Sequence, residues 1–365
     1  MSGEAANELE LEIRRRIAVN GPLNLARYMS LCLAHGEHGY YMKKDPLGVL
    51  GDFTTAPEIS QMFGELIGLW CANIWQSMGA PASMLLAELG PGRGTLMADV
   101  LRAIRSAAPQ FMAALEVHLV ETSPVLREKQ AEALRPSGIV PRWHERVEDV
   151  PPGAAIFIAN EFFDALPIHQ YQKTPEGWRE RLVGAAEQGG FEMALSPLCA
   201  KEDYLPEKLR KAPVGAVAEV SPGRDKVMAA IAKRLARQAG AMLVIDYGHV
   251  KTAHGDSFQA VRNHQYADPL HSPGDADLTS HVDFEHMADI ARDNGAAVHG
   301  PITQAEFLTR LGIEARARAL GARADEAMKT QLEKALHRLT HKEQMGELFK
   351  VLCVTSPTPA SPLPF

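Results

Sequence analysis

Residues 84–95 have the sequence MLLAELGPGRGT, and this stretch decides the fold. An apolar run that begins at Met84 ends at Glu88, and glycines follow at three alternate positions, Gly90, Gly92 and Gly94. The apolar residues after the turn recur with the period of a helix. A strand, a glycine turn and a helix in this order form the opening unit of a nucleotide-binding α/β sheet. Glycine is needed because a ligand approaches the backbone where a Cβ would otherwise stand.

The details of this turn separate two classes of nucleotide. A dinucleotide fingerprint that begins at Gly90 requires glycine or alanine at position 95, which is threonine here. The carboxylate of Glu88 would repel a pyrophosphate, but it suits the cationic amine of a nucleoside that carries an amino acid. The pattern therefore resembles the first motif of class I S-adenosylmethionine methyltransferases. A structural turn without a ligand and a nicotinamide-dependent oxidoreductase are the alternatives for this stretch taken alone.

Acidic residues follow two further predicted strands. Residues 116–120 (EVHLV) predict a second strand that leads into Glu121, where parallel sheets hold the ribose hydroxyls of a nucleoside. The following Thr-Ser-Pro predicts a helix start, so Glu121 is also a candidate helix-start acid. Residues 154–159 (AAIFIA) predict a strand that is buried on both faces. Glu161 and Asp164 follow it, at the edge where such sheets place their chemistry; a surface acid and a helix cap are the alternative.

Composition restricts the class of protein. The 365 residues are 46% hydrophobic and 23% charged, which predicts a soluble globular protein with one large domain and additions, or two domains. A net charge of −7 argues against a nucleic-acid surface. The four scattered cysteines show no metal spacing, so we expect reduced thiols and no metal site. The acidic, polar N-terminus lacks the features of a targeting signal, and polar residues interrupt the apolar stretch at 66–87. We therefore expect no membrane span and a cytoplasmic, bacterial-like protein.

The order of patterns along the chain predicts a core with additions. Apolar residues recur every four residues in the first 33 positions, as in amphipathic helices, and the segment after Pro167 alternates like a β-meander. The expected parts are a helical N-terminal extension with a substrate loop (1–80), a catalytic core (81–355), an inserted subdomain within it (about 167–213), a lid loop (about 250–284) and a flexible proline-rich tail (356–365).

Six stretches in a fixed order resemble one protein family. They are GDFTTAPEISQMFGE (51–65), ELGPGRGTL (88–96), NEFFDALP (160–167), VIDYGH (244–249), RNHQYADP (262–269) and DLTSHVDF (277–284). Over nearly its whole length the chain resembles the MidA-type S-adenosylmethionine-dependent methyltransferases. That family comprises mitochondrial complex I assembly arginine methyltransferases and their bacterial relatives. The sequence SFQAVR at 257–262 departs from the family pattern, which is nearer Gly-Thr-Leu-x-x-Tyr-Arg there.

The resemblance implies both a fold and an activity. The fold is α/β, a class I methyltransferase (Rossmann-like) with a seven-stranded, mostly parallel sheet, a helical N-terminal extension and an inserted β-rich subdomain. The cofactor is S-adenosylmethionine. For the mitochondrial members the reaction is symmetric ω-methylation of an arginine on a core complex I subunit, so a protein substrate is expected. A non-catalytic assembly or scaffold factor and a small-molecule methyltransferase are the alternatives, and the oligomeric state is left open.

The expected site residues fall into three groups. The cofactor-binding group is Glu88, Gly90, Gly92, Gly94, Glu121 and Asn160. The catalytic group is Glu161 and Asp164, whose carboxylates would bind a guanidinium through two hydrogen bonds and concentrate electron density on the attacking nitrogen. The substrate-binding group is Asp52, Phe53, Thr54, Asp246 and Tyr247. The loop that carries Phe53 is expected to close the pocket and exclude water.

Overall fold

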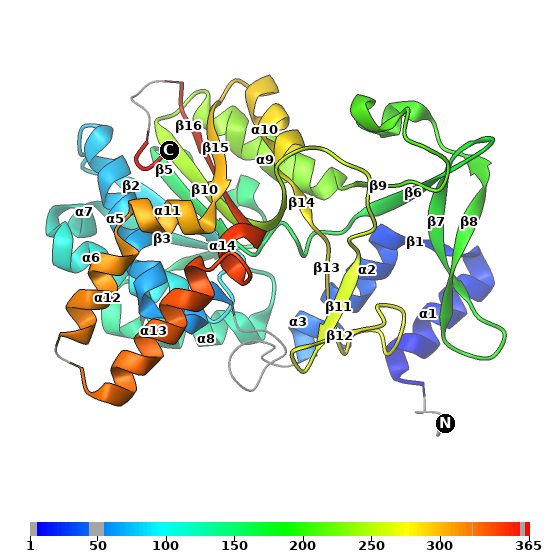
Figure 1. Ribbon diagram of the computed structural model, residues 1–365, viewed down its shortest axis with the longest axis horizontal. Coiled ribbons are helices and arrows are strands. Elements are labelled where there is room, and N and C mark those ends of the chain that lie inside the picture. The colour runs from blue at the N-terminus through cyan, green and yellow to red at the C-terminus, as the bar shows by residue number, and fades with distance from the viewer. Residues whose placement is uncertain (1–5, 44–54, 323, 358–361) are drawn as a thin grey trace. The chain divides into compact units, whose positions relative to one another are not determined.

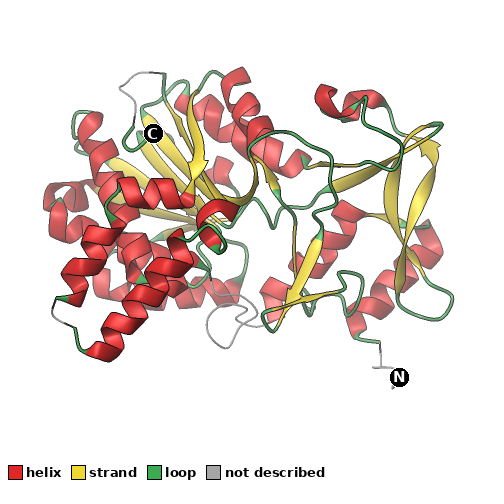
Figure 2. Ribbon diagram, in the orientation of Figure 1, coloured by secondary structure: helices red, strands yellow, loops and turns green. Residues whose placement is uncertain are grey.

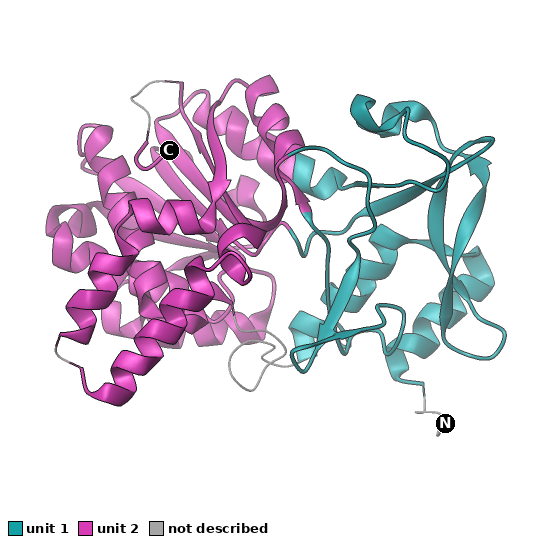
Figure 3. Cartoon of the chain, in the orientation of Figure 1, with its two compact units in different colours: residues 1–53, 164–225, 251–281 teal, residues 54–163, 226–250, 282–365 magenta. Residues whose placement is uncertain are grey.

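The computed structural model describes residues 6–43, 55–322, 324–357 and 362–365 (Figure 1). Strands and helical segments alternate between residues 84 and 160, whereas consecutive strands or consecutive helices make up much of the rest (Figure 2). The chain divides into two compact units, each built from three separate segments (Figure 3). Unit 1 comprises residues 1–53, 164–225 and 251–281, and unit 2 comprises residues 54–163, 226–250 and 282–365.

Unit 2 is built on a mixed sheet. Its strands in spatial order are β15 (Ala297–Thr303), β16 (Phe349–Thr355), β10 (Gly240–His249), β5 (Ala155–Asn160), β2 (Met84–Leu89), β3 (Leu115–Val120) and β4 (Arg142–His144). The two-residue strand β14 (Val282–Asp283) pairs beside this path with β10. Every pairing from β10 to β4 is parallel, whereas β16 is antiparallel to both of its neighbours. The predicted seven-stranded, mostly parallel sheet is confirmed.

The composition of the strands explains their places in this sheet. Strands β2 and β5 are buried at every position, as expected of central parallel strands with both faces covered. Pairing of β4 starts only at Arg142, although the residues before it, Ile139 and Val140, are apolar. Gly138 has a left-handed backbone, and Pro141 has no N–H to donate to a neighbouring strand.

The helices of unit 2 pack against this sheet or against one another. They are α4 (Ala56–Ile59), α5 (Gln61–Ser77), α6 (Thr95–Ala107), α7 (Pro109–Ala114), α8 (Pro124–Leu134), α10 (Phe284–Asp293), α11 (Gln304–Arg310), α12 (Ile313–Gly321), α13 (Glu326–Thr340) and α14 (Met345–Leu348). Helix α9 (Pro222–Leu235) begins in unit 1 and continues in unit 2. The apolar stretch at 66–87 is the end of α5, a turn and the start of β2. No helix in the described part of the chain has the length and apolar character needed to cross a membrane.

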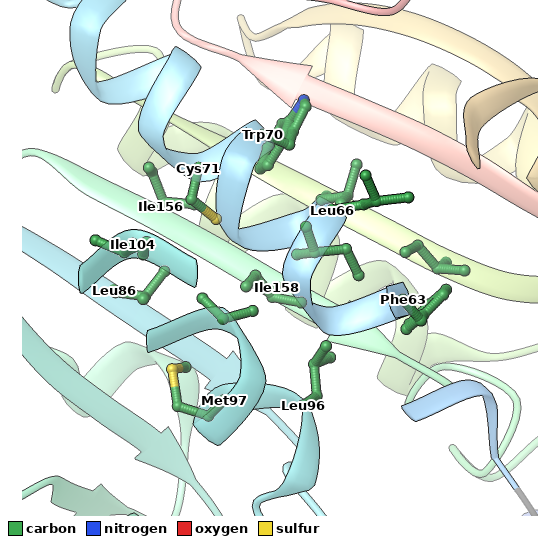
Figure 4. Close-up of a cluster of buried hydrophobic side chains, with 14 of the residues drawn as sticks. Phe63, Leu66, Trp70, Cys71, Leu86, Leu96, Met97, Ile104, Ile156 and Ile158 are labelled. Carbon is green, nitrogen blue, oxygen red and sulfur yellow. The ribbon is translucent and has the colours of Figure 1, made fainter. Parts of the chain in front are cut away.

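The core of unit 2 lies where α5 and α6 meet the central strands. Figure 4 shows side chains of these helices packed with those of β2 and β5. The two helices pack so closely because glycines face α6. A Cβ on Gly64 would lie 2.5 Å from the Cβ of Asp99, and a Cβ on Gly68 would lie 2.7 Å from the carbonyl oxygen of Val100. This close packing fixes the helix that begins at the glycine turn.

Unit 1 combines residues 1–53 of the expected extension with segments that include most of the expected insert and lid, whereas residues 54–80 of the extension belong to unit 2. Its helices are α1 (Glu8–Asn20), α2 (Leu25–Ala34) and α3 (Tyr40–Lys43), and its larger sheet contains β1 (Leu23–Asn24), β6 (His169–Thr174), β7 (Gly177–Ala185), β8 (Phe191–Cys199) and β9 (Val217–Val220). Leu9, Val183 and Leu278, one from each segment, lie in a single buried cluster. The three segments therefore share one hydrophobic core.

The stretch expected as a lid loop contains a small sheet of its own. Strands β11 (Gln259–Arg262), β12 (Gln265–Ala267) and β13 (Asp277–Thr279) pair in an antiparallel arrangement. The hairpin between β11 and β12 turns at Asn263 and His264, which both have positive φ, as a two-residue hairpin turn requires.

The described part of the C-terminal tail contacts unit 2. The ring of Phe365 lies 5.7 Å from that of Phe307, and Arg310 donates a hydrogen bond to the carbonyl of Pro364. Phe365 thus buries part of its ring against the side chain of Phe307.

Candidate cofactor and active site

The glycine turn has the backbone that its sequence predicts. Gly90, Gly92 and Gly94 have φ values of +62°, +52° and +84°, a region that side-chain-bearing residues rarely adopt. The N–H of Gly90 donates to the carbonyl of Val120 at 3.0 Å, which ties the turn to the end of β3. Gly94 is the N-cap of α6, so the first free N–H groups of that helix lie at the turn.

Glu88 is a buried carboxylate at the end of β2. Only 2% of its surface is exposed, and its Oε2 has no hydrogen-bond partner among the described residues. Burial raises its pKa to about 8, because a charge without a partner is costly in a low-dielectric site. Such an acceptor beside a glycine turn suits an ammonium group.

Asn160 supplies a second acceptor at the end of the neighbouring strand. Strands β2 and β5 pair in register, with Glu88 opposite Ile158, so their ends lie at one edge of the sheet. Asn160 is 8% exposed, and its Nδ2 donates to Glu161 Oε1 at 3.1 Å. Its Oδ1 has no partner in the described part of the chain. Two buried acceptors that lack donors therefore fit the amine of the cofactor's amino-acid portion.

Glu121, after β3, has hydrogen bonds from the protein. Its Oε1 accepts the N–H groups of Thr122 and Ser123, each at 2.8 Å, and its Oε2 accepts Gln130 Nε2 at 3.2 Å. Burial still raises the pKa of this carboxyl, but these hydrogen bonds oppose the rise. A carboxylate has about four lone-pair sites. With three in use, Glu121 keeps an acceptor for a ribose hydroxyl, and it also serves the start of α8.

Gln130 links the parts of this site, and the sequence analysis missed it. Its Nε2 also donates to the carbonyl of Gly92 at 2.8 Å, and its Oε1 accepts the indole N–H of Trp143 at 2.8 Å. The signal was present in the sequence. Leu126, Gln130 and Leu134 recur every four residues along α8 and are all buried, so a polar residue interrupts an apolar face.

Glu161 follows β5 in a strained conformation. Its φ of +50° is uncommon for a residue with a side chain, and such strain often occurs at functional sites. Its N–H donates to the carbonyl of Ile245 at 2.9 Å, and its Oε1 accepts the N–H of Ala56 at 3.2 Å. The backbone and the carboxylate are therefore both held in place.

Helix α4 connects the glycine turn with Glu161. Glu58 accepts a hydrogen bond from the hydroxyl of Thr95, and its Oε2 lies 3.9 Å from a guanidinium nitrogen of Arg93. Ala56, from the same helix, donates to Glu161. The predicted substrate residues just before this helix, Asp52, Phe53 and Thr54, lie outside the described residues.

The remaining predicted residues are Asp246, Tyr247 and Asp164. Asp246 is fully buried in β10, where its oxygens accept the N–H groups of Phe163 at 3.0 Å and Tyr247 at 2.9 Å. The ring of Tyr247 packs edge-on against Phe349 at 5.4 Å. Asp164 is buried and begins unit 1, where its carbonyl accepts the N–H of Ser280. No group of three or more His, Cys, Asp or Glu side chains in the described residues is placed to hold a metal ion.

The fold and this site define a class I S-adenosylmethionine methyltransferase. A parallel sheet carries a glycine turn after its first strand, a carboxylate that lacks a donor before the turn, and a hydrogen-bonded acid after the second strand. The family model described as "Putative S-adenosyl-L-methionine-dependent methyltransferase" matches residues 66–302, and the chain belongs to this family. Its cofactor is accordingly S-adenosylmethionine.

Curated relatives and solved structures agree with this family. "Protein arginine methyltransferase NDUFAF7, mitochondrial" of Danio rerio is 38% identical over 93% of this chain and 85% of its own length. The Homo sapiens protein of that name is 37% identical over 92% of this chain and 80% of its own length. A crystal structure from Burkholderia thailandensis, described as a "likely methyl transferase" bound to S-adenosyl-homocysteine, has a TM-score of 0.84 and 26% identity; it covers 97% of this chain and 93% of its own.

These relatives correct one expectation. The cytoplasmic location expected from the sequence is wrong on this comparison, because the curated relatives are named as mitochondrial proteins.

Proposed function

We propose that this chain is a protein arginine N-methyltransferase. The observation that carries the proposal is the similarity to curated protein arginine methyltransferases, at 37–38% identity over more than nine-tenths of the chain. The chemistry at the end of β5 supports it, because a carboxylate held in place is the group that binds a guanidinium.

The residues of the chain perform binding and alignment. When bound, the cofactor supplies an electrophilic methyl group on a sulfonium. An arginine side chain stays protonated in water and its electron density is delocalised, so it is a poor nucleophile. Glu161 binds the guanidinium, orients one nitrogen toward the methyl carbon and favours loss of the proton that leaves this nitrogen. Alignment and electrostatic stabilisation of this kind supply most of the rate in such a transfer.

The other residues of the proposal have narrower tasks. Glu88 and Asn160 hold the amine of the cofactor, and Glu121 holds the ribose. Asp164 is the second candidate carboxylate for the guanidinium. Asp246 and Tyr247 are the proposed substrate-binding residues of β10, and the carboxylate of Asp246 also accepts the N–H groups of Phe163 and Tyr247.

We further propose a subunit of respiratory complex I as the target protein. The support is the family resemblance of the six sequence stretches, together with the mitochondrial naming of the curated relatives.

Labelling tests the proposed function. The purified chain is incubated with methyl-labelled S-adenosylmethionine and a mitochondrial extract, and labelled protein is hydrolysed to amino acids. We expect label in one protein band and its recovery as ω-methylarginine. Label on lysine or histidine, on a small molecule or nowhere would contradict the proposal. Glu161→Gln should lose the label, whereas the control variant Glu132→Gln, which makes the same chemical change at an exposed position of α8, should keep it.

A further inference from the structure

An aromatic ring lies directly against the glycine turn. A Cβ on Gly90 would stand 2.9 Å from Cδ2 of Phe162 and 3.7 Å from its Cβ and Cγ. Gly90 is therefore needed to admit this ring as well as a ligand. Phe162 is half-buried, whereas the adjacent Phe163 is fully buried, so only Phe162 keeps a surface that a ligand can reach.

The ring of Phe162 is held by its neighbours in sequence. The N–H of Glu161 donates to Ile245, and the N–H of Phe163 donates to Asp246. The two phenylalanine rings meet edge to face, with centroids 5.3 Å apart and an angle of 83°. Backbone hydrogen bonds on both sides and this ring contact fix Phe162 before any ligand binds.

The position of Gly90 indicates which part of the cofactor this ring faces. Gly90 comes two residues after Glu88, and its N–H donates to Val120, the residue before Glu121. It therefore lies between the carboxylate that suits the amine and the carboxylate that suits the ribose. In S-adenosylmethionine the sulfonium joins the amino-acid portion to the ribose.

We propose that the face of the Phe162 ring contacts the sulfonium of S-adenosylmethionine and thereby distinguishes the cationic cofactor from its neutral product. An aromatic face attracts a cation, and it has no comparable attraction for the thioether of S-adenosylhomocysteine. The ring thus favours binding of the methyl donor and weakens retention of the product. This inference rests on the cofactor and not on arginine as the target.

Calorimetry without any target protein tests this inference. Dissociation constants are measured for S-adenosylmethionine, S-adenosylhomocysteine and sinefungin, which carries a protonated amine in place of the sulfonium. In Phe162→Leu an apolar side chain remains but the aromatic face is lost. We expect the two cationic ligands to bind about 3- to 30-fold more weakly, and the neutral product to change by less than about twofold.

Two further variants keep the test decisive. Phe111→Leu removes a buried ring that stacks on Trp75, so it should lower thermal stability and leave the ratio of the two affinities unchanged. Phe162→Trp should keep or raise the preference for the cationic ligands, since indole is the best cation-binding ring. The inference is overturned if Phe162→Leu weakens all three ligands equally, if it weakens none, or if Phe162→Trp lowers the preference for the cations.

Discussion

Glu88 and Glu121 lie at the ends of neighbouring parallel strands and are both at least nine-tenths buried, but their surroundings differ. Glu121 accepts three hydrogen bonds from the protein, whereas Glu88 Oε2 has no donor among the described residues. The pKa of Glu88 accordingly rises to about 8 through burial alone. The difference agrees with the roles proposed for the two carboxylates. The protein's own donors orient Glu121, the proposed acceptor for a neutral ribose hydroxyl, whereas Glu88, the proposed acceptor for the ammonium group, would be compensated by the ligand.

The largest expected effect is that of a substitution at Glu161, which follows β5, the other neighbour of β2 in the sheet. Glu161→Gln keeps the shape of the side chain and removes the charge that binds the guanidinium. We expect a loss of about 2–4 kcal/mol of transition-state stabilisation, roughly a hundredfold or more in single-turnover rate. Affinity for S-adenosylhomocysteine, measured by calorimetry, should stay within about threefold of the wild type. A variant that methylates at the wild-type rate would show that Glu161 is structural.

Glu88→Gln tests the proposal that Glu88 binds the ammonium group of the cofactor. The amide keeps the volume but cannot compensate the ammonium of the cofactor. Removing one partner of a buried charge pair costs about 2–3 kcal/mol, so we expect affinity for S-adenosylhomocysteine to fall roughly 30- to 100-fold. The rate at saturating cofactor should change little, the reverse of the result at Glu161. Unchanged affinity would mean that the amine binds elsewhere.

The pKa of Glu88 predicts how cofactor affinity depends on pH. In the free protein this carboxyl is protonated below about pH 8, and it must lose the proton to accept an ammonium. Binding therefore releases a proton at neutral pH, and affinity rises by up to about tenfold per unit from pH 6 to 8. Above pH 8 the rise should level off. Calorimetry in buffers of different ionisation enthalpy measures the released proton. Glu88→Gln should abolish the release, and a wild-type protein that releases none would contradict a protonated Glu88.

The sequence predicts the parts of the site that depend on local pattern. The apolar run before Glu88, the alternate glycines and the buried strand before Asn160 determine their own structures, because strand burial and positive φ are local requirements. These features predicted a nucleotide-binding α/β sheet, whereas the seven strands and S-adenosylmethionine as the cofactor were implied by the family resemblance.

The remaining features depend on contacts between distant residues. Gln130 matters because its amide reaches Gly92, 38 residues away in the sequence, and the strained Glu161 is held by Ala56, 105 residues away. The three segments of unit 1 meet in one core, although residues 54–163 separate the first segment from the second and residues 226–250 separate the second from the third. No local pattern specifies such contacts.

The smallest expected effect is that of a substitution at Gln130, whose amide donates a hydrogen bond to Glu121. Gln130→Leu removes the donor to Glu121 Oε2 and to the carbonyl of Gly92. The hydrogen bond to Glu121 has a net value of about 0.5–1.5 kcal/mol. Affinity for S-adenosylhomocysteine should therefore fall about 2- to 10-fold, and the melting temperature of the variant should be lower than that of the wild type. Glu132→Gln on the same helix is the control. A loss as large as that of Glu88→Gln would mean that the two carboxylates do not differ as described.

The most direct test of the roles proposed for Glu88 and Glu121 is a crystal structure of the chain with S-adenosylhomocysteine bound. We predict that the amine of the ligand lies within hydrogen-bond distance of Glu88 Oε2 and Asn160 Oδ1, that a ribose hydroxyl lies on Glu121, and that the sulfur lies over the face of Phe162. Glu121 should keep its bonds to Thr122 and Ser123. An amine bound away from Glu88, or a ribose that displaces the hydrogen bonds of Glu121, would contradict the account.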